Sequence, residues 1–171
     1  MEEREHIVSI PQLIVQVMDL PDEGINLEGS VPVCEFDLEN DGRFSFNDAE
    51  LRYRLHVALV QKEVIVTGGI EADVMAMCDR CAEWAPLHVA DTEIFHSYTD
   101  ETFEPVDLTE DIREDLVLMF PDQFLCKEDC RGICPVCGQN LNEVQCGCDV
   151  SSDWEDEESP WSALEDLEKK L

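Results

Sequence analysis

Eight of the nine cysteines fall into four close-spaced pairs, and six of them lie within residues 126–148. The pairs are Cys78-x2-Cys81, Cys126-x3-Cys130, Cys134-x2-Cys137 and Cys146-x-Cys148. Protein zinc sites take four ligands, with thiolate sulfur at about 2.3 Å, and a two-residue spacer lets two thiolates reach one ion. This density and spacing of thiols predict metal binding, with zinc as a structural ion.

Several ligand assignments are compatible with these spacings. Cys134 and Cys137 are the strongest candidates, because Gly138 can adopt the positive φ that closes a knuckle turn. The other ligands are expected in the same compact loop, among Cys126, Cys130, Cys146 and Cys148. The one-residue gap in the last pair is tight for a knuckle and favours only one of the two as a ligand. Cys78 and Cys81, at the tip of a predicted hairpin, are further candidates that could complete a second site, so one or two ions are expected.

A thiol-redox enzyme using a CxxC dithiol is the alternative interpretation. Its reactive thiolate would need a helix N-terminus or nearby cations to lower its pKa. Neither CxxC pair begins a predicted helix, and the surroundings are acidic apart from Arg80 and Arg131. This alternative is therefore the weaker one.

Other catalytic groups are sparse, so the sequence predicts a protein that is not an enzyme. There is no GxSxG motif and no phosphate-binding glycine loop. The histidines are scattered: His6, His56, His88 and His96. His88 and His96 are expected on one face of one strand in a structural role. Cys34 is predicted to be a small buried side chain on a strand.

The chain is strongly acidic, with 41 acidic and 11 basic residues and a formal charge of -30. Such a field repels a polyphosphate backbone, which argues against extensive direct contact with nucleic acid. It favours a basic protein partner, although the charge could also serve only solubility. The chain shows no apolar run of signal-peptide or membrane-spanning length, so a cytoplasmic location is expected. In that reducing compartment, metal binding explains the cysteines better than disulfides do.

Alternating apolar residues predict a three-stranded antiparallel meander in the middle of the chain. A Gly68-Gly69 pair within its second strand indicates a bulge or a bend. Earlier segments predict short edge strands and a second strand separated from the meander by a tight loop. The ranges are 7–17 for the edge strands, 31–38 for the second strand, 39–43 for the loop, and 51–59, 64–74 and 87–98 for the meander, with a turn at 61–63.

A helix is predicted over residues 109–120, capped by Thr109 and stopped by Pro121. Its apolar face is Ile112, Leu116 and Met119. After the cysteines, residues 149–158 predict an acidic linker. Residues 159–171 predict an amphipathic helix that begins at Ser159-Pro160 and must dock on its own domain or on a partner.

These elements predict an α+β protein. Its parts are a small antiparallel β-domain at 1–105, built as a meander or a partly closed barrel, a helix and connector at 106–125, a cysteine-rich zinc-binding loop at 126–148, an acidic linker at 149–158 and a C-terminal amphipathic helix at 159–171.

The order of these motifs resembles the YceD family of large ribosomal RNA subunit accumulation proteins. The resemblance is carried by CDRC at 78–81 after a strand containing Gly69, by a helix ending at Pro121, and by GICPVCGQNLN at 132–142. It implies that the early CxRC maps onto Cys78, Arg80 and Cys81, and the later block onto the six cysteines of 126–148. Some family members lack the later block, which implies that a metal bound there has a structural and not a catalytic role. The very acidic linker after Cys148 departs from the family pattern.

The resemblance implies a non-enzymatic bacterial or organellar factor needed for accumulation of large-subunit (23S) rRNA. Together with the acidic charge, it gives the hypothesis of a ribosome-biogenesis factor that contacts a basic ribosomal or assembly protein of the large subunit. On this hypothesis rRNA contact is indirect or limited, and neither a membrane nor a small-molecule substrate is involved.

Overall fold

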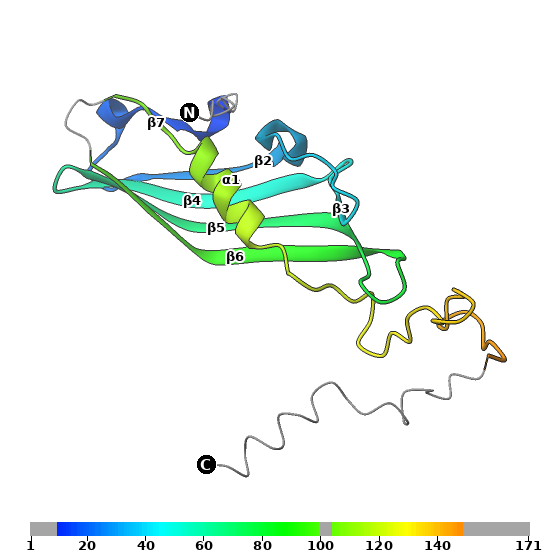
Figure 1. The fold of residues 1–171 in the computed structure, drawn as a ribbon. Coiled ribbons are helices and arrows are strands. Elements are labelled where there is room, and N and C mark those ends of the chain that lie inside the picture. Colours follow the sequence, from blue (N-terminus) through cyan, green and yellow to red (C-terminus); the bar gives the residue numbers. More distant parts are fainter. Residues whose placement is uncertain (1–9, 100–103, 149–171) are drawn as a thin grey trace, which may run out of the picture.

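The computed structural model describes residues 10–99 and 104–148 (Figure 1). The predicted acidic linker at 149–158 and C-terminal helix at 159–171 lie outside the described residues, as do residues 7–9 of the first predicted strand segment. The described part is mostly antiparallel β-sheet with one α-helix, and the cysteine-rich loops extend beyond one end of the sheet (Figure 1).

A five-stranded antiparallel sheet forms the body of the protein. Its strands are β2 (Ile25–Pro32), β3 (Phe44–Ser45), β4 (Glu50–Val60), β5 (Glu63–Met77) and β6 (Trp84–Thr99). β4 and β3 pair with successive parts of β5 on one side, β6 pairs along its other side, and β2 pairs with β4. The predicted meander is therefore confirmed. The sheet is open, with β2 and β6 at its edges, so the partly closed barrel alternative is wrong.

The alternation of side chains in β4 and β5 explains the hydrophobic core. In β4, Leu51, Tyr53, Leu55 and Val57 are buried, while the residues between them face outward. The strands join through Gln61 and Lys62, which both have positive φ, as a tight hairpin turn requires. One face of the sheet is thus apolar and covered, and the opposite face, called the outer face below, is polar.

A β-bulge interrupts the pairing of β5 with β6. Gly68 pairs with Ile94 and Ile70 pairs with Asp91, so Gly69 alone faces Thr92 and Glu93. The bulge predicted at the glycine pair is confirmed, although the additional residue belongs to β6. Because one additional residue reverses the alternation, residues of β6 before and after the bulge switch faces.

The bulge separates the two histidines of β6, so the prediction that they share a face is wrong. His88 lies on the outer face, where Nδ1 is 2.8 Å from Oδ1 of Asp73. His96 lies on the covered face, where Nε2 is 2.6 Å from Oδ2 of Asp115. Both histidines are bound to carboxylates of neighbouring elements, as expected of structural residues.

The helix α1 (Thr109–Leu118) crosses the covered face of the sheet (Figure 1). Ile112 and Leu116 are fully buried, as predicted, and the helix ends two residues before the predicted end. Thr109 is not the N-cap, because it already has helical geometry and its hydroxyl accepts the backbone N–H of Ile10. Asp107 takes the capping role, since its Oδ1 accepts the backbone N–H of Thr109 at 3.0 Å.

Short 3₁₀ segments replace much of the strand predicted near the N-terminus. Within the described part of residues 7–17, strand β1 (Ile14–Val15) pairs with β7 (Val106–Asp107). It is flanked by 3₁₀ segments at Pro11–Leu13 and Val17–Asp19.

The strand predicted over 31–38 is also wrong for most of its length. β2 ends at Pro32, and a 3₁₀ helix follows at Val33–Phe36. A 3₁₀ helix has three residues per turn, so Val33 and Phe36 lie on the same side of it and are both buried. Cys34 lies on another side and points outward. Cys34 is accordingly exposed, which corrects its prediction as a buried residue.

Within the described residues, no helix has the length and apolar character needed to cross a membrane.

Candidate metal centres

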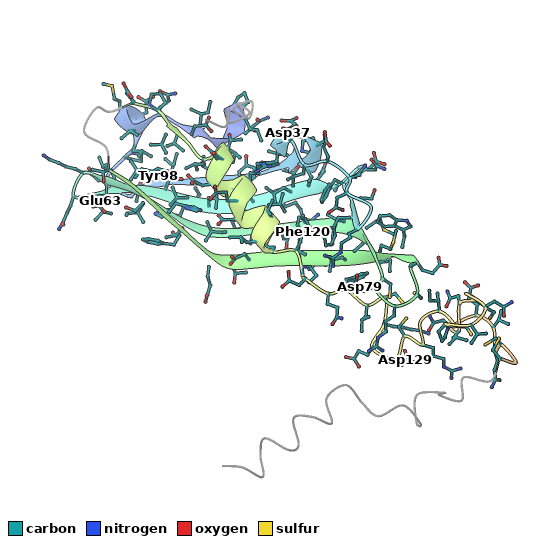
Figure 2. All side chains as sticks on the ribbon, in the orientation of Figure 1. Asp37, Glu63, Asp79, Tyr98, Phe120 and Asp129 are labelled. Atoms are coloured by element: carbon teal, nitrogen blue, oxygen red, sulfur yellow. The ribbon has the colours of Figure 1, made fainter. Side chains whose placement is uncertain are left out.

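The eight paired cysteines gather into two separate groups of four. The first cluster consists of Cys78, Cys81, Cys126 and Cys130, and the second of Cys134, Cys137, Cys146 and Cys148. In each cluster the four sulfur atoms lie within 4.8 Å of one another. No other group of three or more metal-ligating side chains comes together within residues 10–99 and 104–148. Figure 2 shows the hairpin that carries Asp79 and the loop that carries Asp129 at the same end of the sheet.

The sulfur positions of the first cluster fit a tetrahedral ion. The Sγ atoms of Cys78 and Cys130 are 3.8 Å apart, and those of Cys81 and Cys126 are 3.6 Å apart. Four sulfurs at about 2.3 Å from one zinc ion would lie about 3.8 Å from one another. A disulfide would need about 2.05 Å. The spacing therefore matches shared coordination.

The first cluster joins the β5–β6 hairpin to the chain that follows α1. Cys78 and Cys81 come from the hairpin, and Cys126 and Cys130 from the later loop. Asp79 fixes this approach, because its N–H donates to the carbonyl of Phe124 at 2.9 Å and its Oδ2 accepts the N–H of Phe124 at 2.7 Å. The cluster thus brings two distant segments of the chain together.

Backbone and amide donors favour thiolates in the first cluster. Burial raises the pKa of Cys78, but the N–H groups of Cys126, Cys81 and Arg80 outweigh it and lower that pKa to about 6. The side-chain amide of Asn142 lowers the pKa of Cys130, with Nδ2 donating to Sγ at 3.3 Å.

The other two thiols of the first cluster titrate in the opposite direction. Burial raises the pKa of Cys81. Burial and the neighbouring thiol of Cys81 raise the pKa of Cys126 to about 12. A divalent cation bound beside these two thiols would favour their thiolate forms.

The second cluster is built around a knuckle. The N–H of Gly138 donates to the carbonyl of Cys134 at 2.8 Å, and Gly138 has φ 71°, which confirms its predicted positive φ. The N–H groups of Cys137 and Val136 lower the pKa of Cys134 to about 6. Cys137 raises the pKa of Cys148 to about 12. The second cluster repeats the pattern of low and high thiol pKa values found in the first.

The two clusters differ in exposure. In the first, three of the four cysteines are buried; in the second, only Cys134 is buried and Cys137 is exposed. A short connection ties the clusters together, since the N–H of Ile133 donates to the carbonyl of Arg80 at 3.1 Å. Gly132, with φ 74°, allows this approach, because a Cβ there would lie 2.9 Å from the same carbonyl oxygen.

The structure groups the candidate ligands differently from the single-loop arrangement expected from spacing. Cys126 and Cys130 lie with the hairpin cysteines and away from Cys134 and Cys137. Cys146 and Cys148, both candidate ligands, join the second cluster together despite their tight spacing. The ligand roles themselves stay predictions. Sequence reasoning missed Asn142, because an uncharged amide in a loop carries no signal of its contact with a thiol.

Comparison with known proteins gives a family for the second half of the chain. The family model described as "Large ribosomal RNA subunit accumulation protein YceD" matches residues 85–168. Just under half of the chain thus matches the YceD family. The YceD match begins within β6, so it contains α1 and six of the clustered cysteines, whereas Cys78 and Cys81 precede it. The YceD description names accumulation of the large ribosomal RNA subunit.

Three mycobacterial proteins are similar to this chain. Uncharacterized protein Rv2926c of Mycobacterium tuberculosis and uncharacterized protein Mb2951c of Mycobacterium bovis are each 36% identical over 102 residues, covering 51% of this chain and 49% of their own length. Uncharacterized protein ML1660 of Mycobacterium leprae is 29% identical over 108 residues, covering 54% of this chain and 50% of its own length. The chain thus spans about half the length of these relatives. No solved structure matches it significantly.

Proposed function

We propose that this protein is a non-enzymatic ribosome-biogenesis factor that supports accumulation of the large-subunit (23S) rRNA. The match of residues 85–168 to the YceD family carries this proposal. The formal charge of -30 makes a basic ribosomal or assembly protein a better partner than rRNA itself. Such a factor would affect rRNA levels indirectly, because rRNA that is not assembled with its proteins is degraded.

The proposal assigns structural zinc to both clusters. Four thiolates in a tetrahedral arrangement suit zinc or an iron–sulfur centre, and closed four-thiolate zinc sites are structural. The residues present fit zinc, since the observed sulfur separations of the first cluster match its tetrahedron. When bound, zinc would supply cross-linking and charge neutralisation.

The hydrophobic core supports this structural role. Within residues 125–148, no apolar residue packs against the main core. Ile133, Val136 and Val144 of the cysteine-rich loop are exposed by 48%, 65% and 50%. Residues 126–148 therefore depend on something other than apolar burial, and metal coordination can supply that free energy.

Metal analysis of the purified full chain tests the zinc assignment. Native mass spectrometry together with elemental analysis is expected to show two zinc ions per chain. Cys130→Ser and Cys137→Ser should each leave one ion, and Cys34→Ser, which alters the exposed cysteine outside both clusters, should leave two. An apo mass for the wild-type chain, or iron in place of zinc, would overturn the assignment.

Depletion of the protein in its host tests the cellular role. We expect a lower ratio of 23S to 16S rRNA, and co-sedimentation of the protein with large-subunit precursors. After nuclease treatment, a basic ribosomal or assembly protein should still co-purify with it. An unchanged rRNA ratio would contradict the proposed function, and loss of the partner on nuclease treatment would show that contact runs through RNA.

A further inference from the structure

β6 is a long strand with a free edge. It has 16 residues and pairs with β5 along one side. Within residues 10–99 and 104–148, no strand pairs with its other side, and Figure 1 shows β6 as the last strand of the sheet. The outward-pointing N–H and C=O groups of an edge strand are a template for an added strand.

The first part of this edge carries features that hinder pairing with another strand, namely a proline and a bulge, and the last part does not. Pro86 removes one N–H, and the bulge at Thr92 and Glu93 disturbs the next stretch. Residues 94–99, with the sequence IFHSYT, follow the bulge as a regular run that pairs residue by residue with β5. This run lies at the end marked by Glu63 and Tyr98, away from the cysteine clusters near Asp129 (Figure 2).

The surroundings of this free edge are acidic. β6 contains no Lys or Arg, and it carries Asp91 and Glu93 next to the run. The helix α1 adds Asp115 and Asp111, which are hydrogen-bonded to His96 and Tyr98 of the run.

Two arginines of the neighbouring elements are held by contacts elsewhere. Arg113, the basic residue of α1, donates to the carbonyl of Phe36 at 2.9 Å. Arg52 lies on β4 and is paired with Glu71 and Asp73 of β5. A basic segment would therefore meet negative charge along the β6 edge.

We propose that residues 94–99 of β6 bind an extended basic segment of a partner protein as an added strand. Main-chain hydrogen bonds would supply the pairing, and Asp91, Glu93, Asp111 and Asp115 would select basic side chains. Phe95, which is 63% exposed, offers an apolar contact to alternate residues of the added strand. The choice of a ribosomal or assembly protein as owner of that segment rests on the proposed function. A second copy of this chain is disfavoured, because it would bring the same acidic edge and a formal charge of -30.

Amide hydrogen exchange of the full-length, metal-loaded chain, followed by NMR, tests the proposal with a defined probe. The probe is an acetylated and amidated eight-residue peptide that alternates Lys or Arg with Val. At saturation it should slow exchange at least tenfold at the outward-pointing amides of residues 94–99. Two matched peptides serve as controls: one carries Glu in place of Lys and Arg, and the other carries backbone N-methyl groups on the pairing side. Both should bind at least tenfold more weakly.

Charge reversal on the two edges of the sheet provides the matched variants. Glu93→Lys, beside the run, should weaken binding of the basic peptide about fivefold or more, whereas Glu28→Lys, exposed on the opposite edge strand β2, should leave it unchanged. Exchange changes confined to β2 or to the cysteine clusters, or equal binding of the acidic peptide, would overturn the proposal. So would full protection of residues 94–99 in the free chain, which would show that another segment of this chain or a second copy already covers the edge.

The outcomes of this test and of the depletion experiment are separable. Normal 23S rRNA after depletion, with peptide binding on β6, would overturn the proposed function and leave the edge site standing. A lowered ratio of 23S to 16S rRNA without peptide binding would overturn the edge site and leave the proposed function standing.

Discussion

Asn142 supports a cysteine of the first cluster from a loop that belongs to the second. Its Nδ2 donates to Sγ of Cys130 at 3.3 Å, and its Oδ1 accepts the N–H of Arg131 at 2.9 Å. Groups that hydrogen-bond to metal ligands tune their charge and orientation. Asn142 therefore links the first cluster to the loop that carries the second.

Asn142→Ala is expected to weaken zinc binding at the first cluster about tenfold or more, because the thiolate of Cys130 loses a donor. Chelator competition on the full chain measures this effect. The affinity of the second cluster, whose four sulfurs make no contact with Asn142, serves as the internal control. Equal weakening at both clusters would show that the substitution disrupts the loop as a whole.

Asp41 holds the loop before β3. Its Oδ1 accepts the N–H groups of Phe44 and Arg43 at 2.9 and 2.8 Å, and these hydrogen bonds lower the pKa of Asp41 below its ordinary value of 3.8. A carboxylate with a lowered pKa adds stability that is fully present above its ordinary pKa. That stability is lost as the pH falls through the lowered value.

Asp41→Asn should keep most of the hydrogen bonding and remove this pH dependence. The difference in unfolding free energy between wild type and Asp41→Asn is expected to be largest near pH 6 and to shrink below about pH 4. Urea unfolding at each pH measures it, and the use of a difference cancels loss of metal in acid. A difference that does not vary with pH would contradict the role of the Asp41 charge.

Conformations of single residues were predictable where local chemistry decides them. The positive φ of Gly138 follows from a knuckle turn that a Cβ would strain. Thr109 and Cys34 were predicted wrongly, because their surroundings depend on distant segments. The contact of Thr109 with Ile10 spans 99 positions, and the turn that exposes Cys34 forms because Val33 and Phe36 enter the core.

At the scale of elements, the bulge of β5 and β6 depends on two adjacent glycines. Gly68 has φ 148°, and a Cβ there would lie 2.2 Å from the carbonyl oxygen of Arg54. At Gly69 a Cβ would lie 2.7 Å from the carbonyl oxygen of Asp91. The backbones of β4 and β6 therefore approach the glycine pair from both sides.

Gly68→Ala is expected to destabilise the protein by about 2–3 kcal/mol or more, since backbone must move to admit the methyl group. Gly42→Ala is the matched control, because Gly42 also has positive φ but a methyl group added there would meet no atom within 4 Å beyond its chain neighbours. It should cost only about 1 kcal/mol. Chemical denaturation measures both, and equal losses would show that φ alone, without crowding, determines the cost.

The helix α1 is stabilised by the packing of its buried face against the sheet more than by the intrinsic helix propensity of its residues. Leu116→Ala is expected to cost about 2–5 kcal/mol, because the side chain is fully buried against the sheet. Leu118→Ala on the same helix, 81% exposed, should stay within about 0.5 kcal/mol of wild type. Thermal or urea unfolding distinguishes them, and a small effect at Leu116 would mean that α1 detaches easily from the sheet.

Elements in which apolar residues recur at a regular interval were predictable from sequence, whereas elements whose conformation is determined by packing were not. The meander follows from alternation over β4, β5 and β6. Residues rich in β-branched side chains near the N-terminus suggested strands, but packing against the core turned much of 11–19 into 3₁₀ segments. The bulge was predictable, but its effect on the two histidines was not, because the additional residue lies on β6.

At the scale of the whole molecule, the two cysteine clusters differ in the segments that they bring together. The first joins the sheet to the loop after α1, and the second closes only residues 134–148. Cysteine spacing predicted the clusters as a set. It could not divide them, because the first combines residues from a hairpin and from a loop that only the fold brings together.

Chelation is expected to remove the two ions in order, the second cluster first, because its thiols are more exposed. Loss of that ion should change the melting temperature of the sheet little, and loss of the other should lower it clearly. Stepwise chelator titration followed by native mass spectrometry and calorimetry measures both steps. Release of both ions in a single step would show that the two clusters behave as one unit.

The order of segments along the chain has a consequence for how the protein is made. Ribosomes add residues from the N-terminus, so β5 and β6 emerge before the loop that carries Cys126 and Cys130. The nascent hairpin thus presents Cys78 and Cys81 as two neighbouring thiols before Cys126 and Cys130, their partners in the proposed zinc site, have left the exit tunnel. Oxidation at that moment would pair Cys78 with Cys81, and the proposed metal bridge between the two segments could then no longer form.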